Sequence, residues 1–125
     1  MRATKAAVVQ ASPVYMNLDG CIDKASTLIK EAASNGANII AFPETWIPGY
    51  PWFVWLGAPA WSLQFIPPYH ENSMEVDSPQ MKKLCQAAKE NNIQVCFGFS
   101  EKAAGTRYMS QALLSENGEI LFVRR

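Results

Sequence analysis

A carboxylate directly follows a short apolar run in the segment Asn38-Ile39-Ile40-Ala41-Phe42-Pro43-Glu44. An apolar run of this length, closed by a proline, predicts a buried β-strand over 38–42. A second apolar run at 5–11 predicts another buried strand upstream. Between them, apolar residues recur at helical spacing, which predicts a helix that begins at the cap Asn17 and ends at Asn35-Gly36. Strand, helix and strand in this order predict a parallel pair joined by a right-handed crossover.

The second half of the chain continues this α/β pattern and then changes it. Ser78-Pro79 predicts the start of a helix that Asn91-Asn92 ends. Residues 93–100 alternate between large and small side chains without a charge, which predicts a strand with both faces covered. Residues 108–114 and 120–123 flank Asn117-Gly118, a strong hairpin signal. The pattern therefore predicts one α/β domain over 1–125 whose sheet becomes antiparallel near its end.

Composition and charge narrow the class of protein. The 125 residues are 49% hydrophobic and 18% charged, which indicates a globular chain and argues against a disordered one. Eleven basic and eleven acidic side chains cancel, and the basic ones form no stripe. Nucleic acid is therefore not an expected partner, because binding it rests on clustered Lys and Arg.

The stretch 45–69 contains no charged residue but holds all four tryptophans and five of the eight prolines. Because those prolines break any continuous helix, we expect a loop with short helical turns and no membrane-spanning segment. The first residues lack the apolar core of a signal peptide. Three cysteines without CxxC spacing, Cys21, Cys85 and Cys96, are typical of reduced thiols. We therefore expect a cytoplasmic protein without a disulfide or a zinc site.

Glu44 is the residue with the most informative chemistry. It lies at the end of the predicted buried strand and opens the aromatic stretch. Burial disfavours the charged form of a carboxylate, which is what a general base working near neutrality needs. The structural alternative is that Glu44 accepts backbone N–H groups and caps the loop. The only histidine, His70, has just Ser73 nearby as a nucleophile, so we expect a loop or surface residue there.

The segment from Gly36 to Pro51 resembles the glutamate signature of the nitrilase branch of carbon–nitrogen hydrolases. Its matching elements are a glycine after a helix, an apolar strand, Phe42-Pro43-Glu44, and then Gly49-Tyr50-Pro51. The continuation Trp52-Phe53-Val54-Trp55-Leu56-Gly57 looks like nitrilases and cyanide-degrading relatives more than like amidases. The resemblance implies the amino-terminal part of a four-layer α-β-β-α sandwich.

The resemblance also implies a mechanism with a Glu, a Lys and a Cys. Glu44 would be the proton acceptor, and a cysteine thiolate would attack a nitrile through a covalent thioimidate and an acyl-enzyme. No metal and no cofactor would be needed, the substrate would be a small nitrile, and the complete protein would form a homo-oligomer. Tyr50 is the favoured substrate-binding residue, because the Gly49 turn would bring it back towards the acid. For Trp46 and Trp55, pocket lining and core packing fit the sequence about equally well.

Measured against the family pattern, this chain should stop before the catalytic Lys and Cys. None of the three cysteines has the Cys-Trp-Glu or Cys-Gly-Glu neighbours that the nucleophile has in the family. We therefore expect residues 1–125 to be a partial domain without turnover on its own. The alternatives within the superfamily are a cyanide hydratase or dihydratase and an amidase. The alternative outside it is a non-enzymatic binding or regulatory fragment, which would have to fold alone despite an exposed sheet edge.

Overall fold

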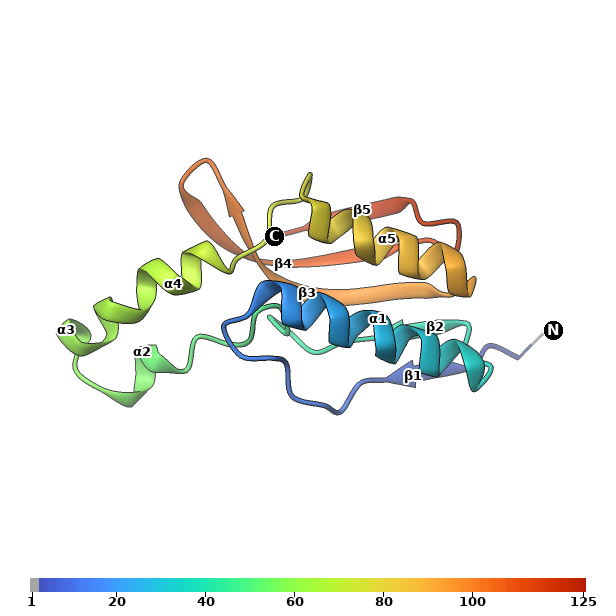
Figure 1. The fold of residues 1–125 in the computed structure, drawn as a ribbon, viewed down its shortest axis with the longest axis horizontal. Coiled ribbons are helices and arrows are strands. Elements are labelled where there is room, and N and C mark those ends of the chain that lie inside the picture. The colour runs from blue at the N-terminus through green and yellow to red at the C-terminus, as the bar shows by residue number, and fades with distance from the viewer. Residues whose placement is uncertain (1–2) are drawn as a thin grey trace.

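The computed structural model describes residues 3–125 and shows a mixed five-stranded sheet (Figure 1). The strands lie side by side in chain order, and they are β1 (Ala6–Val8), β2 (Ile39–Ala41), β3 (Gln94–Ala103), β4 (Thr106–Leu114) and β5 (Ile120–Arg124). Strands β1, β2 and β3 are parallel, whereas β4 and β5 each run antiparallel to the strand before them. The predicted α/β class, parallel pair and antiparallel end are confirmed.

Two long helices, α1 (Leu18–Ser34) and α5 (Pro79–Asn91), pack side by side on one face of the sheet (Figure 1). Both begin where the capping residues predict. The Asn17 side chain accepts a hydrogen bond from the Gly20 amide, and the Ser78 hydroxyl accepts one from the Met81 amide. After α1, Gly36 takes the left-handed conformation with φ of 83°, as expected at a helix end.

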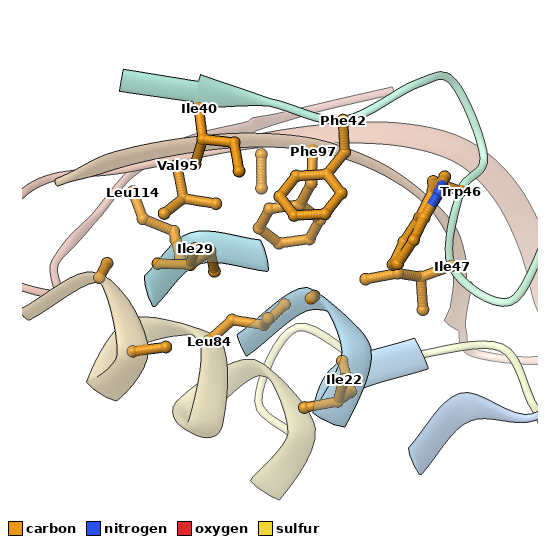
Figure 2. Packing of buried hydrophobic residues seen from close by; sticks show 14 of the residues in the cluster. Ile22, Ile29, Ile40, Phe42, Trp46, Ile47, Leu84, Val95, Phe97 and Leu114 are labelled. Carbon is orange, nitrogen blue, oxygen red and sulfur yellow. The ribbon is translucent and has the colours of Figure 1, made fainter. Parts of the chain in front are cut away.

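The hydrophobic core fills the layer between these helices and the sheet (Figure 2). Ile40, Val95, Phe97 and Leu114 point from β2, β3 and β4 towards side chains of α1 and α5, among them Ile22, Ile29 and Leu84. Each of these side chains is almost completely buried. Because burying one large apolar side chain stabilises the folded state by about 1.5–3 kcal/mol, this layer provides the main driving force for folding.

Between β2 and α5 the chain leaves the sheet in a helical excursion, residues 53–71 (Figure 1). It consists of α2 (Phe53–Leu56), α3 (Pro59–Ser62), the 3₁₀ turn η1 (Leu63–Phe65) and α4 (Ile66–Glu71). The predicted short helical turns are confirmed. Nowhere in residues 3–125 is there a helix with the length and apolar character to cross a bilayer.

One expectation about the sheet is wrong and another holds only in part. The predicted buried strand at 5–11 is only the three residues of β1, and Val8 is 82% exposed because it faces the side of the sheet that the helices do not cover. The β3 strand was expected to be covered on both faces. Helices α1 and α5 cover the side of Phe97, whereas on the opposite side Gly98 and Ser100 are buried but Cys96 is only half-buried. We call the opposite side of the sheet the open face, and its alternating residues include Val8, Ile39, Cys96, Leu113 and Phe122.

Both hairpins close with left-handed turn residues. In the predicted β4–β5 turn, Gly118 has φ of 80°. The β3–β4 turn at Ala104-Gly105 was not predicted, and both residues have positive φ, the requirement of a tight two-residue hairpin. As a result β3 extends three residues beyond the predicted end of the strand at Ser100.

Candidate active site

Glu44 lies on a turn that interrupts the pairing of the chain with β3. The Phe42 amide donates to the Cys96 carbonyl at 2.9 Å, and the Ile47 amide donates to the Gly98 carbonyl at 3.3 Å. The two acceptor residues are two positions apart and their carbonyls point to the same edge of β3, whereas the two donor residues are five positions apart. Residues 43–46 therefore loop out of the ladder, and we call them the Glu44 turn.

The Glu44 turn rests directly on Gly98. A Cβ atom at position 98 would lie 2.6 Å from the Thr45 amide nitrogen and 2.7 Å from the Pro43 carbonyl oxygen, which only glycine avoids. Because Phe97 and Phe99 face the helices, Gly98 faces the other way. The turn thus holds Glu44 over the open face of the sheet.

The residues after Glu44 fix the turn from the core side. Thr45 is buried with φ of 48°, an unfavourable conformation for a β-branched residue, and its hydroxyl has no hydrogen-bond partner among the described residues. The Trp46 ring is buried against Phe42, with centroids 4.9 Å apart, and its Nε1–H donates to the Ala11 carbonyl at 2.7 Å. The turn is therefore strained at one residue and anchored at the next.

Glu44 itself is exposed, so the predicted burial of its carboxylate is wrong for the described chain. The reason is tertiary: β2 is buried by helices on one face only, and the turn carries the acid to the other face. The side chain is not isolated in solvent, however, because it lines two separate hollows.

The first hollow, the polar pocket, has a volume of about 460 Å³ on the open side of β3, β4 and β5. Glu44 shares it with Gly98, Met109, Ser110, Gln111, Arg124 and Arg125. Arg124 pairs with Gln111 across the strands, and its Nε–H donates to the Gln111 amide oxygen at 2.9 Å. The pocket therefore combines one carboxylate with positive charge.

Glu101 is a functional candidate that the sequence reasoning missed. Its carboxylate is only 3% exposed and accepts hydrogen bonds from Arg125, at 2.7 Å and 3.2 Å, and from Ser110, at 2.6 Å. Donation from Arg125, together with the Ser110 bond, holds the pKa of Glu101 below its ordinary value against the opposing effect of burial. The Arg125 guanidinium also lies 3.9 Å from the Tyr108 ring centroid. The available signal was an acid that directly follows the uncharged run 93–100.

The second hollow, the aromatic pocket, has a volume of about 340 Å³ on the other side of Glu44. Its walls include Tyr15, Pro43, Trp46, Gly49, Tyr50 and Trp52. Of the sequence-predicted binding residues, Tyr50 and Trp46 thus lie beside Glu44 here. Trp55 does not line this pocket; it is 72% exposed, and its Nε1–H donates to the Tyr50 hydroxyl at 3.3 Å. Glu44 stands where the polar and aromatic pockets adjoin.

Comparison with known proteins shows to which family the chain belongs. The sequence model of the carbon-nitrogen hydrolase family matches residues 5–125. The chain belongs to the carbon-nitrogen hydrolase family. It is 46% identical over 121 residues to a nitrilase of Pseudomonas syringae, and 49% identical over 122 residues to an aliphatic nitrilase of Rhodococcus rhodochrous. These alignments cover 97% of this chain but 36% and 32% of the relatives, so the chain spans about a third of their length.

Solved structures confirm the fold of this carbon-nitrogen hydrolase. An amidase from Nesterenkonia sp. superimposes with a TM-score of 0.69 at 18% identity, over 96% of this chain and 41% of that one. A second structure of a Nesterenkonia amidase gives a TM-score of 0.71 at 17% identity, over 98% of this chain and 44% of that one. The described residues form one helix layer and one sheet of the nitrilase-like α-β-β-α fold.

None of the three cysteines lines either pocket beside Glu44. The Cys21 thiol is buried and donates to the Val14 carbonyl at 3.2 Å, and burial raises its pKa to about 11. Burial also raises the pKa of Cys85 and of Cys96. Thiols that resist ionisation are poor nucleophiles. Cys21 lies in the hydrophobic core and Cys85 packs against it, whereas Cys96 lies half-buried on the open face.

The histidine and potential metal ligands add no second site. His70 is half-buried on α4, and the nearby Ser73 hydroxyl is already bonded to the Tyr69 carbonyl and to Ser100. Across residues 3–125, the His, Cys, Asp and Glu side chains form no group of three that could hold a metal ion. Among the residues that line the polar and aromatic pockets, Glu44 is the one acid.

Proposed function

We propose that the complete protein is a nitrilase that hydrolyses a nitrile to a carboxylic acid and ammonia. The observation that carries this proposal is the position of Glu44, held by Gly98 at the junction of a polar and an aromatic pocket. Support also comes from the relatives, because curated nitrilases are 40% to 49% identical to this chain over nearly its whole length. The proposal concerns the complete protein, of which these residues form one part.

In the proposed mechanism Glu44 is the general base of a Glu-Lys-Cys triad. Its carboxylate takes the proton from a cysteine thiol, and the thiolate forms a bond to the nitrile carbon to give a thioimidate. Water adds to that carbon and ammonia leaves, which gives a thioester; a second water releases the carboxylic acid and restores the thiol. The lysine stabilises charge that develops on the attacked group. We propose that this Lys and Cys lie outside residues 1–125, which form part of one carbon–nitrogen hydrolase domain.

The two hollows beside Glu44 suggest how a substrate is oriented. The aromatic pocket has mostly apolar walls that suit the carbon substituent of a nitrile, with Tyr50 and Trp46 as contacts and Trp55 as a support for Tyr50. The polar pocket offers Arg124 and Gln111 near the reacting carbon and nitrogen. We further propose a cytoplasmic homo-oligomer that acts on small molecules without a cofactor, and not on nucleic acid or in a membrane.

The deciding experiment replaces Glu44 by Gln in the full-length protein and measures ammonia release from nitriles. Glutamine keeps the size of the side chain but cannot take a proton, so we expect activity to fall by about a thousandfold or more. Glu119→Gln, an exposed acid in the β4–β5 turn, is the matched control and should retain full activity. Glu44→Gln activity within tenfold of the wild type would rule out the base role.

The same assay separates the related activities. Wild-type protein that released ammonia from amides but not from nitriles would be an amidase. Conversion of cyanide alone would identify a cyanide hydratase or dihydratase, with formamide or formate as the respective product. Folded full-length protein that was inactive on all three substrate classes would favour a non-enzymatic role.

A further inference from the structure

Tyr69, on α4 of the helical excursion, is bonded to the segment that forms one wall of the aromatic pocket. Its side chain is 4% exposed, and its hydroxyl donates to the Gly49 carbonyl at 2.9 Å. Gly49 has φ of 111°, and a Cβ atom there would lie 2.6 Å from the Tyr15 ring. Gly49 is thus held between two tyrosines, one against its α-carbon and one at its carbonyl oxygen. The next residue is Tyr50, which lines the pocket beside Glu44.

The Tyr69 hydroxyl is itself held at a defined position relative to the sheet. The Ser73 hydroxyl bonds to the Tyr69 carbonyl at 2.8 Å and to the Ser100 hydroxyl of β3 at 2.8 Å. The Met74 amide then donates to the Ser100 carbonyl at 2.9 Å, which ties the end of α4 to β3. Burial raises the pKa of Tyr69 to about 12, so its hydroxyl stays protonated and able to donate. Gly98, the support of the Glu44 turn, is two residues away on the same strand.

We call Gly49, Tyr50 and Trp52 the Tyr50 wall of the aromatic pocket. The chain after this wall is held by the buried Phe53 ring, which packs on Tyr69 with centroids 5.6 Å apart. Tyr50 contacts Trp52, with ring centroids 4.8 Å apart, and accepts a hydrogen bond from Trp55. Trp52 and Trp55 are 59% and 72% exposed, so neither ring is anchored in the core. The backbone of Ile47 is hydrogen-bonded to Gly98 and Ser100 of β3, which fixes the chain before this wall. The Tyr69–Gly49 bond is the buried hydrogen bond that holds the wall itself, through α4, to the same strand.

We propose that Tyr69 is a positioning residue that sets the distance between the Tyr50 wall and Glu44, and thereby how tightly the enzyme binds nitriles with a bulky aromatic substituent. This inference rests on the proposed nitrilase function. A large substituent fills the aromatic pocket and touches the Tyr50 wall, whereas a small aliphatic one does not reach it. A displaced wall therefore weakens the binding of aromatic nitriles selectively.

The test compares Tyr69→Phe with the wild type in the full-length protein, using phenylacetonitrile and propionitrile. Phenylalanine keeps the buried ring and removes only the hydroxyl. Because one hydrogen bond is lost, we expect KM for phenylacetonitrile to rise about three- to tenfold while kcat stays within about twofold. KM for propionitrile should change less than about twofold.

Ser62→Ala is the matched control. The Ser62 hydroxyl is also buried in the helical excursion and donates to a backbone carbonyl, that of Phe53, at 2.8 Å, but Ser62 lines neither pocket beside Glu44. It should lower Tm about as much as Tyr69→Phe does and leave both KM values unchanged. Should Tyr69→Phe fail to fold, Ser73→Ala, which removes the side-chain hydrogen bonds that join α4 to β3, is expected to give the same selective rise in KM.

The outcomes are distinguishable. Unchanged KM values for Tyr69→Phe, an equal rise for both nitriles, or the same selective rise in Ser62→Ala would overturn the positioning role while nitrilase activity stands. Wild-type protein that hydrolyses neither nitrile would overturn the proposed function, and the positioning role with it.

Discussion

At the scale of single residues, Glu101 and Arg125 form the one salt bridge within residues 3–125. Glu101 is buried and also accepts from Ser110, whereas the Arg125 side chain is half-exposed. An acid in this position has a lowered pKa because its charged form is stabilised by the donors around it. The pair fixes the residue that follows β5 against β3, close to the polar pocket.

This pairing predicts a pH dependence of stability. Because the folded-state pKa of Glu101 lies below its ordinary value of 4.5, its stabilisation is fully present above that pH. It is lost as the pH falls through the lowered folded-state value, where the carboxylate takes up a proton. We expect Glu101→Gln to lower the free energy of unfolding at neutral pH, with a smaller deficit at about pH 3. Urea unfolding at several pH values measures both quantities.

Glu119→Gln serves as the control for this prediction, because Glu119 is exposed and forms no salt bridge. It should leave the free energy of unfolding nearly unchanged at each pH. A Glu101→Gln deficit that was the same at acid and neutral pH would mean that the charge of Glu101 does not contribute.

At the scale of elements, the placement of Glu44 depends on how closely its turn approaches β3. We expect Gly98→Ala to destabilise the folded state by about 1–3 kcal/mol, because the added methyl group would overlap backbone atoms of the turn. It should also lower nitrile hydrolysis in the full-length protein by displacing Glu44. Urea unfolding and ammonia release measure the two effects.

Gly20→Ala is the control for the element-scale prediction. Gly20 lies inside α1, where an added Cβ would meet the side chains of Asn17 and Val14 at 3.0 Å and not the backbone of another segment. The Val14 side chain can move, and the higher helix propensity of alanine offsets part of any weakening of the Asn17 cap. The cost should therefore be smaller than at Gly98. Gly98→Ala with full stability and activity would show that the turn does not need the close approach.

At the scale of the whole molecule, the open face is the side of the sheet that no helix of residues 3–125 covers. It presents Val8 and Phe122, which are 82% and 44% exposed, in addition to half-buried apolar residues on the central strands. Exposed apolar surface and an exposed edge strand both promote association. In the α-β-β-α fold of the family, a second sheet provides the natural cover for such a face.

This predicts that the 125-residue chain by itself associates through the open face. Val8→Lys combined with Phe122→Lys should reduce its light scattering, because charge on that face opposes contact between copies. Thr27→Lys, an exposed position on α1, adds a charge on the opposite side of the molecule and should have little effect. Equal scattering by the double variant and the wild type would show that another surface drives association.

Much of the secondary structure could be predicted because its signals are local. Asn17 and Ser78 each cap a helix through an amide three residues away, and Asn117-Gly118 closes the hairpin it predicts. The aromatic stretch was predicted as short helical turns from its prolines and glycines. The Glu44 motif indicated the family for the same reason, since its residues are contiguous in the chain.

The amino-acid sequence by itself therefore determined the order and type of the elements, the family, and Glu44 as the candidate base. Only the tertiary structure decided that Glu44 stands exposed on Gly98, that Glu101 pairs with Arg125, and that Tyr69 holds Gly49. Each of these contacts joins residues at least twenty positions apart. Capping and periodicity depend on the nearest few residues, whereas which distant segments meet depends on how the sheet and the helices pack, and no local pattern records that.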